Sequence, residues 1–258
     1  MTFSFTKYQG TGNDFIMVDC TNSPDFKLTD DQINDLCDRR FGIGADGVIL
    51  IFKDPTLDFK MSYYNSDGSQ SFCGNGARCA VKFAKTLNLF QNKATFLAID
   101  GEHEATIDND LVSLKMNDVK SFSKDDTAFI IDTGSPHYVK FVSDVDDEDI
   151  VKYGREVRYS PKYKAKGINV NLVEVLADNQ LEILTYERGV EDETYSCGTG
   201  ATAVALAYAL VLDYDDIDVK INVKGGELAV KAERNDSTFD YIYLIGPAEK
   251  VFDGEISI

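Results

Sequence analysis

Two cysteines in this sequence stand directly before a Gly-x-Gly-Ala segment, and no other pattern in it points as clearly to chemistry. They begin the segments Cys73–Ala77 (CGNGA) and Cys197–Ala201 (CGTGA), which lie 124 residues apart. A cysteine at the start of a helix is close to unpaired backbone N–H groups and to the positive end of the helix dipole, which favour the thiolate over the thiol. The adjacent glycines let further N–H groups approach a bound anion.

Two such thiols could invert a carbon atom that lies between them. One, as the thiolate, removes a proton from one face, and the other, as the thiol, returns a proton to the opposite face. N–H groups at the helix starts would stabilise the charge that develops on a carboxylate next to that carbon. A structural zinc site is not expected, because the sequence has no Cys-x-x-Cys pair and only two histidines. We also expect no metal or pyridoxal cofactor, because this reaction needs neither and the sequence shows no evident site for one. The pattern predicts a cofactor-independent amino-acid epimerase.

The other three cysteines, Cys20, Cys37 and Cys79, are expected to be small core residues. An odd number of cysteines and an N-terminus without the pattern of a secretory signal favour reduced thiols and a cytoplasmic location. The formal net charge of −18 disfavours binding to nucleic acids and to anionic membranes. The longest apolar run, Ala203–Leu212, is shorter than the roughly 18 residues that span a bilayer. A small-molecule substrate is therefore expected.

The spacing of the two cysteine motifs also indicates a duplicated half. The same offset pairs Leu57 with Leu181, each at the start of a strand-like run, and Gly101 with Gly225, each inside a two-strand pattern. Each half then contains strands, a turn rich in Asp, Gly and Ser, the cysteine motif, one helix and further strands.

We expect an α/β protein with two similar halves in a pseudo-twofold arrangement, each with strands that wrap a central helix. The N-terminal half, 1–117, carries Cys73, and the C-terminal residues 249–258 are expected to pack on it. The C-terminal half, 118–248, carries Cys197. The polar segment 117–127 lacks periodicity and is the expected junction.

The helices differ in their expected exposure. The helix after Cys197 (ATAVALAYALVL) is apolar on all sides and should be enclosed. Arg78, Lys82 and Lys85 should leave the helix after Cys73 less completely enclosed. Thr29–Arg39 is predicted to be a surface helix that begins with a capping box.

Two further patterns indicate structure rather than a site. Gly42–Gly47 (GIGADG) has the form of a dinucleotide-binding fingerprint, but it follows a helix and precedes a strand, so a turn is expected. His103 has no partner at the spacing of a metal site and is expected to be an ordinary polar strand or turn residue.

The sequence around both cysteines resembles the diaminopimelate epimerase family. The segments that carry the resemblance are NSDGSQSFCGNGARC and ERGVEDETYSCGTGATA, together with KYQGTGNDFIMVD, GSPHYV and GINVNLVEV in the same order as in the family. The resemblance runs through nearly the whole chain. It implies interconversion of LL- and meso-diaminopimelate, in the biosynthesis of lysine and of peptidoglycan precursors. It also implies two similar α/β halves and a homodimer.

The resemblance further assigns roles to residues. It implies that Cys73 and Cys197 are the catalytic base and acid, and that His137 and Glu187 tune the pKa values of the two thiols. The substrate-binding residues that it implies are Asn13 in GTGNDF, Asn65 in NSDGS, Asn169 in GINVN, the helix-start residues Gly74, Asn75, Gly198 and Thr199, and the charged pair Glu187 and Arg188. A planar guanidinium such as that of Arg188 suits a carboxylate that does not react. Glu187 supplies the negative charge that an ammonium group needs.

The chain departs from the family pattern at three places. The family often has Gln at the position of Gly47 and Asn at the position of Ser135, so one substrate contact is expected to be missing and another shortened. The loop ERGVEDET differs from the commoner ERGxGxT by Glu191 and Asp192, a difference for which the sequence offers no physical reason.

Three other functions remain open at this point. A proline-racemase-like enzyme also uses two cysteines, but the GNDF segment and the Glu187–Arg188 pair favour a substrate with a second charged end. A cysteine hydrolase or transferase could use Cys73 as nucleophile and His137 as base, which would leave the second cysteine motif without a role. In a binding or structural protein both thiols would simply be packed.

Overall fold

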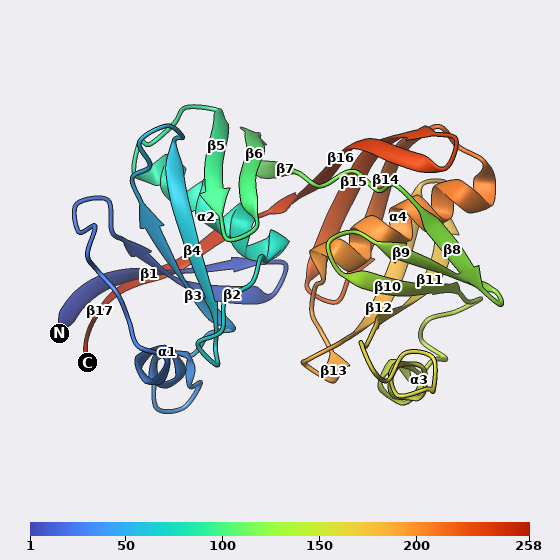
Figure 1. Ribbon diagram of the computed structural model, residues 1–258, viewed down its shortest axis with the longest axis horizontal. Helices are drawn as coiled ribbons and strands as arrows, with labels where there is room; N and C mark the ends of the chain where they lie inside the picture. Colours follow the sequence, from blue (N-terminus) through green and yellow to red (C-terminus); the bar gives the residue numbers. More distant parts are fainter. The chain divides into compact units, whose positions relative to one another are not determined.

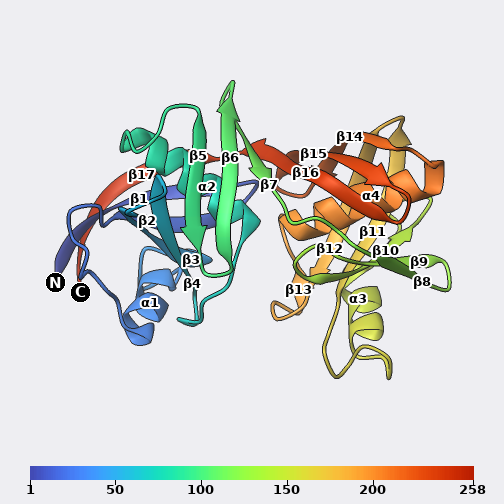
Figure 2. The same ribbon diagram turned by 45° about the horizontal axis from the view of Figure 1, so that its top comes forward.

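The computed structural model describes residues 1–258 and divides into two compact units. The first unit contains Met1–Leu114 and Gly246–Ile258, and the second contains Lys115–Ile245. Figures 1 and 2 show in each unit a set of strands around one helix, with a second helix outside the strands.

The first unit is a mixed sheet of eight strands with two helices. In their order in the sheet, the strands are β17 (Glu249–Ser257), β1 (Thr2–Gly10), β2 (Asn13–Asp19), β3 (Gly47–Phe52), β4 (Phe59–Asn65), β5 (Lys93–Ala98), β6 (Gly101–Asp108) and β7 (Leu111–Lys115). The pairs β2–β3 and β4–β5 are parallel and the other pairs are antiparallel. The helices are α1 (Asp30–Cys37) and α2 (Gly74–Thr86), and α2 packs against β1, β2, β3, β4 and β6.

The second unit repeats this order. Its strands are β8 (Phe122–Asp125), β9 (Ala128–Asp132), β10 (Pro136–Phe141), β11 (Asn169–Ala177), β12 (Gln180–Glu187), β14 (Asp216–Val223), β15 (Gly226–Asn235) and β16 (Thr238–Pro247), with the short β13 (Asp192–Glu193) beside β12. The pairs β10–β11 and β12–β14 are parallel and the rest are antiparallel. The helices are α3 (Ile150–Arg158) and α4 (Gly198–Leu212), and α4 packs against β9, β10, β11, β14 and β15.

The two units therefore share strand order, strand direction and helix position, which confirms the predicted α/β fold with two similar halves. One of the pairings proposed from the sequence is wrong by a residue. Gly101 opens β6 at a φ of 132°, and the residue at the same place in the second unit is Gly226, at a φ of 142°, not Gly225. Both glycines follow a two-residue loop, so the hairpin geometry fixes the equivalence.

The central helices follow from their sequences. α4 is buried from Gly200 through Ala209, because its apolar side chains face neighbours on every side. α2 is partly exposed at Lys82 and Lys85, as expected, but Arg78 is completely buried. The prediction that Arg78 marks an exposed face of the helix is therefore wrong. No helix in the structure is both long and apolar enough to cross a membrane.

The remaining structural expectations concern local elements. α1 begins after Thr29, whose hydroxyl accepts from the Gln32 backbone N–H while the Gln32 side chain accepts from the Thr29 N–H, so the capping box is confirmed. Gly42–Gly47 connects α1 to β3 as a turn. His103 lies on β6 and contacts Asp100 at 2.9 Å. Residues 117–127 include β8.

Candidate active site

Cys73 is the residue that begins α2 in the first unit. It has extended backbone angles, and its sulfur accepts a hydrogen bond from the Gly76 N–H at 3.5 Å. Gly74 and Asn75 form the first turn of the helix and are buried. The Cys73 sulfur lies 3.6 Å from Asn13 Oδ1, and Asn75 Nδ2 donates to the same oxygen at 3.2 Å. The structure thus brings Asn13, Cys73 and Asn75 together at one helix start.

A network of charged side chains fixes the orientation of Asn13. Its Nδ2 donates to Asp46 Oδ2 at 2.5 Å, which turns Oδ1 toward Cys73. Asp46 and Asp14 both bind Arg39, at 2.7 and 2.8 Å, and Asp14 also pairs with the buried Lys7 at 2.8 Å. Burial acts to raise the pKa of Asp14, but the hydrogen bonds from Arg39 and Lys7 outweigh it and hold the pKa below its usual value. The network contains two cations and two anions, so it is neutral.

Asn65 and Gly47 lie opposite each other on β4 and β3. The Asn65 side-chain amide donates to Ser69 and Ser71 and so holds the turn that leads toward Cys73. A side chain at Gly47 would place its Cβ 2.3 Å from the Tyr64 carbonyl oxygen. A residue with a Cβ at this position would require the neighbouring strand to move.

Cys197 begins α4 in the second unit and is 6% exposed. Its side chain makes no capping hydrogen bond to the helix, and its sulfur lies 3.5 Å from Thr199 Oγ1. Thr199 Oγ1 is also 2.9 Å from His137 Nε2, and its carbonyl oxygen accepts from Thr133 Oγ1 at 2.8 Å. Gly198 and Thr199 form the first turn of α4 as Gly74 and Asn75 do in α2.

The hydrogen bonds around His137 determine its tautomer. Asn171 Oδ1 accepts from Thr185 Oγ1 at 3.0 Å, so Asn171 Nδ2 is the donor that faces His137 Nδ1 at 3.1 Å. Nδ1 therefore accepts, and the proton of the neutral ring is on Nε2, which donates to Thr199. Asn169 Nδ2 also lies 3.4 Å from Nε2, but its two hydrogens bind the closer Ser135 Oγ and Pro136 carbonyl oxygen, at 2.8 and 3.2 Å. The Thr199 hydroxyl can then donate to a Cys197 thiolate or accept from a Cys197 thiol.

His137 has an unusually low basicity. It is 0% exposed, and burial, with a further contribution from the positive charge of Arg188, lowers its pKa to about 3. A neutral ring with both nitrogens hydrogen-bonded is poorly suited to act as a general base at neutral pH. The Thr199 hydroxyl connects this neutral ring to Cys197, because it lies 2.9 Å from His137 Nε2 and 3.5 Å from the Cys197 sulfur.

The buried neutral His137 predicts a loss of stability in mild acid. Its pKa is lower in the folded than in the unfolded state, so its stabilising contribution is complete above pH 6.5 and is lost as the pH falls toward 3. The free energy of unfolding should fall by up to about 1.4 kcal/mol per pH unit in this range. Chemical denaturation between pH 6.5 and 5, above the range in which most carboxyl groups titrate, measures this slope. His137→Asn should flatten it, and an identical slope in the variant would contradict the assignment.

Asn169 connects two other predicted residues of the second unit, Ser135 and Arg188. Its Nδ2 donates to Ser135 Oγ at 2.8 Å, and its Oδ1 accepts from the Arg188 backbone N–H at 2.9 Å. The exposed Arg188 guanidinium donates to the Lys166 carbonyl oxygen at 2.9 Å and lies 3.5 Å from Ser135 Oγ. Glu187 ends β12 directly before Arg188. These residues form one continuous group beside His137. His137 on β10 and Asn169 on β11 are paired positions of these two parallel strands.

The structure explains the acidic loop after Arg188. Glu191 has a φ of 61°, and its carboxylate accepts from the Tyr186 hydroxyl at 2.7 Å and from the Gly189 N–H at 3.1 Å. Arg158 Nε lies 3.4 Å from the same carboxylate. Glu191 therefore closes the turn that holds Arg188 in place. Asp192 belongs to β13, where it lies opposite Glu187 of the antiparallel strand β12.

The second glycine of each cysteine motif is needed for packing. A Cβ at Gly200 would lie 2.7 Å from Asn171 Oδ1, the atom that orients the amide facing His137. A Cβ at Gly76 would lie 3.1 Å from Ile49 Cδ1 and 3.3 Å from the Phe15 ring. The two glycines let each helix start approach the adjacent strands closely.

Sequence reasoning missed two contributors to these sites. Asn171 holds His137, and its signal was the spacing of Asn169 and Asn171, which places both side chains on the same face of one strand. Asp46 orients Asn13 across β2 and β3, which no local pattern indicates. Thr199 was expected to bind substrate, and it also connects His137 to Cys197.

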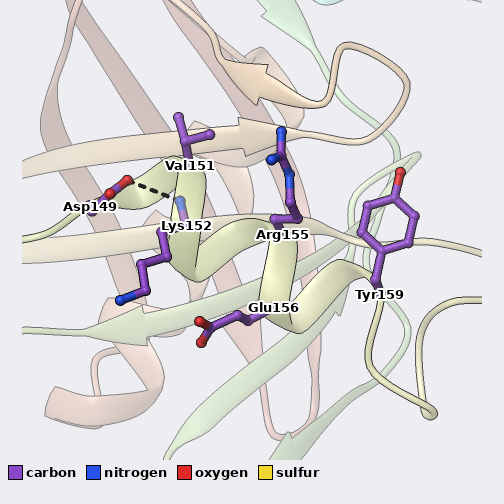
Figure 3. Close-up of a pocket in the computed structure, with 6 residues that line it drawn as sticks. All are labelled: Asp149, Val151, Lys152, Arg155, Glu156 and Tyr159. Atoms are coloured by element: carbon purple, nitrogen blue, oxygen red, sulfur yellow. Dashed lines mark hydrogen bonds between the residues drawn. The ribbon is translucent and has the colours of Figure 1, made fainter.

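A surface pocket lies elsewhere, along one face of α3 (Figure 3). It contains no cysteine and no predicted site residue. Its lining residues are Asp149, Val151, Lys152, Arg155, Glu156 and Tyr159. Asp149 caps α3 by accepting from the Lys152 N–H at 2.9 Å.

Solved structures similar to this chain show the same fold. A PhzF-family phenazine biosynthesis protein from Bacillus anthracis matches with a TM-score of 0.75 and 13% identity, over 100% of both chains. A hydroxyproline epimerase from Agrobacterium vitis matches with a TM-score of 0.67 and 14% identity, over 100% of this chain and 93% of the other. At these identities the likeness shows the fold alone.

Sequence comparison identifies the family. The family profile described as diaminopimelate epimerase matches residues 5–121 and 129–251. The diaminopimelate epimerase of Flavobacterium psychrophilum is 51% identical over 252 residues, which cover 97% of this chain and 98% of that protein. The enzyme of that name from Chlorobaculum tepidum is 38% identical over 258 residues, covering 96% and 99%. With both cysteine motifs at helix starts inside this match, the chain belongs to the diaminopimelate epimerase family.

Proposed function

We propose that this protein interconverts LL- and meso-diaminopimelate by moving protons between its two helix-start cysteines and the substrate α-carbon. The observation that carries the proposal is the placement of Cys73 and Cys197 as the N-cap residues of equivalent helices in two units of the same topology. Inversion needs an acid and a base on opposite faces of one carbon, and an internal duplication supplies two equivalent groups. The thiolate removes the α-proton and the thiol delivers its proton to the other face.

In this proposal the two helix starts also stabilise the charge on the substrate carboxylate. When the α-proton leaves, negative charge develops on the adjacent carboxylate, and we assign its stabilisation to the backbone N–H groups of Gly74, Asn75, Gly198 and Thr199 in the first turns of α2 and α4. The reaction requires proton transfer only, so we propose that it proceeds without metal or pyridoxal. His137 tunes Cys197 through Thr199, and Asn13 contacts Cys73 directly.

Recognition of the distant end of the substrate is assigned to the second unit. Arg188 has an exposed guanidinium that donates to the Lys166 carbonyl oxygen, and its backbone N–H is held by Asn169, so its fork can receive a carboxylate. Glu187 supplies a negative charge for the ammonium group, and Asn169 and Ser135 supply neutral polar contacts, to which Asn65 of the first unit adds another. A proline-like substrate has no second charged end, which disfavours the racemase alternative. The hydrolase alternative is disfavoured because His137 is a weak base that contacts Thr199 of the Cys197 helix.

A direct assay tests this function. Purified protein, with no cofactor added, is incubated with LL-diaminopimelate or with L-proline, and the stereoisomers are separated by chiral chromatography. We expect conversion to an equilibrium mixture with diaminopimelate and none with proline. Conversion of proline alone would replace the proposal with a racemase, and dependence on added pyridoxal phosphate or metal would contradict the two-thiol reaction.

The cellular setting and assembly are part of the same proposal. We propose a cytoplasmic enzyme of lysine and peptidoglycan precursor biosynthesis, in which the cysteines stay reduced. We also propose a homodimer, supported by Val251 and Phe252, two adjacent apolar residues on β17 that are 56% and 44% exposed. Light scattering of the purified chain measures the assembly state.

A further inference from the structure

α2 carries a buried arginine that no carboxylate neutralises. Arg78 is 0% exposed, and its guanidinium donates to the Pro247 carbonyl oxygen at 3.5 Å and to Thr11 Oγ1 at 3.3 Å. Its Nη1 atom has no hydrogen-bond partner, and no Asp or Glu acts on it. Arginine remains protonated even when buried, so this positive charge needs a negative partner.

The charged groups on the strands around α2 have other partners. The titratable side chains that are not exposed on these strands are Lys7 and Tyr8 on β1, Asp14 on β2, Tyr63 and Tyr64 on β4, and His103 and Glu104 on β6. Asp14 is neutralised by Lys7 and Arg39, and Glu104 pairs with Lys93 at 2.8 Å. β3 has no titratable residue. None of these strands provides an anion for Arg78.

Two thiols on the same helix remain as possible partners. The thiolates of Cys79 and Cys73 are the groups whose negative charge favours the protonated Arg78, against the effect of burial, which lowers its pKa. Burial raises the pKa of Cys79 to about 12, so Cys79 is a thiol at neutral pH. Cys73 is different, because it lies at the helix start and its sulfur accepts the Gly76 N–H.

The contact between Asn13 and Cys73 favours the thiol form of Cys73 rather than the thiolate. Asn13 Oδ1, 3.6 Å from the Cys73 sulfur, can accept a hydrogen bond only from the protonated thiol. A single long contact to sulfur is weak, whereas a full charge acts strongly inside a protein, where screening by water is reduced. The positive charge of Arg78 and the helix start together favour the Cys73 thiolate more than the Asn13 contact favours the thiol.

The second unit has no such cation in its interior. The position 124 residues after Arg78 is Thr202, a buried neutral residue whose hydroxyl donates to the Gly198 carbonyl oxygen at 2.9 Å. All other buried polar side chains of this unit are uncharged: Thr133, His137, Asn169, Asn171, Thr185 and Ser196. The cation that acts on this site, Arg188, is exposed to solvent, which screens its charge. The two cysteine sites are therefore electrostatically unequal.

We propose that Arg78 is a positioning residue whose buried charge makes Cys73 the thiolate and leaves Cys197 the thiol in the free enzyme. The inference rests on the proposed two-cysteine reaction. In the first turnover the Cys73 thiolate takes the α-proton and becomes a thiol, while the Cys197 thiol gives its proton to the carbanion and becomes a thiolate. The resting state is restored when a proton passes from Cys73 to Cys197 through solvent.

Site-resolved alkylation tests the assignment without substrate. The full-length protein is treated briefly with iodoacetamide between pH 5 and 10, and modification of each cysteine is quantified by peptide mass spectrometry. In the wild-type protein Cys73 should titrate at lower pH than Cys197. Arg78→Met, which removes the charge and keeps an apolar side chain, should raise the apparent pKa of Cys73 by at least about one unit, a tenfold change in its thiolate fraction. Arg78→Lys should retain most of the effect.

The controls distinguish an effect of the Arg78 charge on Cys73 from an effect of misfolding. Thr202→Val changes the equivalent buried position of α4 without altering charge, and it should leave the Cys73 titration unchanged. An unchanged Cys73 titration in folded Arg78→Met would overturn the proposal. If that variant does not fold, the wild-type titration decides, because a lower apparent pKa at Cys197 than at Cys73 contradicts the assignment. Either result can occur with epimerase activity intact, so it is distinguishable from failure of the proposed function.

Discussion

Replacing either Cys73 or Cys197 with alanine should lower kcat by at least about 1000-fold, because each variant lacks the acid or the base on one face of the α-carbon. Serine variants should be almost as inactive, because a hydroxyl preserves the polarity of the helix start but is far less acidic than a thiol. The effect should be the same in both directions of the reaction, since running it backward exchanges the roles of the two thiols. Chiral chromatography of the reaction mixture measures the rate.

A matched control is available in the same chain. Cys20 is buried, and burial raises its pKa to about 12, so it is a core thiol that takes no part in proton transfer at neutral pH. Cys20→Ala should retain full activity and lose only about 1 kcal/mol of stability. Circular dichroism should show all the variants folded. Full activity in a folded Cys73→Ala or Cys197→Ala variant would eliminate the two-thiol mechanism.

Removing the guanidinium of Arg188 should raise KM for diaminopimelate by about 10- to 150-fold, the equivalent of losing charge-assisted hydrogen bonds worth about 1.5–3 kcal/mol. The carboxylate that Arg188 receives is far from the reacting carbon, so ground state and transition state lose similar binding energy and kcat should change less than KM. Arg188→Lys keeps the charge but not the planar fork, and its KM should lie between those of the wild type and Arg188→Ala.

The control for Arg188 is an arginine outside the two cysteine sites. Arg40 is exposed in the first unit, and its backbone N–H binds Asp38 at 2.7 Å. Arg40→Ala removes one positive charge from the protein without changing the distant-carboxylate contact, so its KM should equal that of the wild type. A KM for Arg188→Ala equal to that of Arg40→Ala would remove Arg188 from substrate recognition.

The main features of the fold could be predicted because local sequence determines them. Cys73 and Cys197 were placed at helix starts from the glycines that follow them, and α4 was expected inside because it has no polar face. The repeated spacing gave the equivalence of the two units, with an error of one residue at Gly225. That error arose because identical glycines are adjacent at 225 and 226, and only the hairpin register shows which one has the positive φ.

The parts that could not be predicted depend on contacts between distant segments. The burial of Arg78 is determined by Thr11 and Pro247, which come from opposite ends of the chain, whereas a charged residue in a helix locally suggests a solvated face. The tautomer of His137 depends on Asn171 from a neighbouring strand. Sequence similarity suggests that His137 tunes a thiol, and only the hydrogen bonds indicate that the ring faces Thr199 as a neutral donor.

The most direct test of the central claim is the isotope content of substrate and product during the first turnovers in deuterated water. With separate acid and base, the incoming proton comes from a thiol that has exchanged with solvent, and the outgoing proton goes to the other thiol. We therefore expect the newly formed stereoisomer to contain one deuterium at the inverted carbon, while the recovered substrate still contains protium. Product that retains the original protium, or deuterium that enters the substrate as fast as the product, would contradict proton transfer by two cysteines.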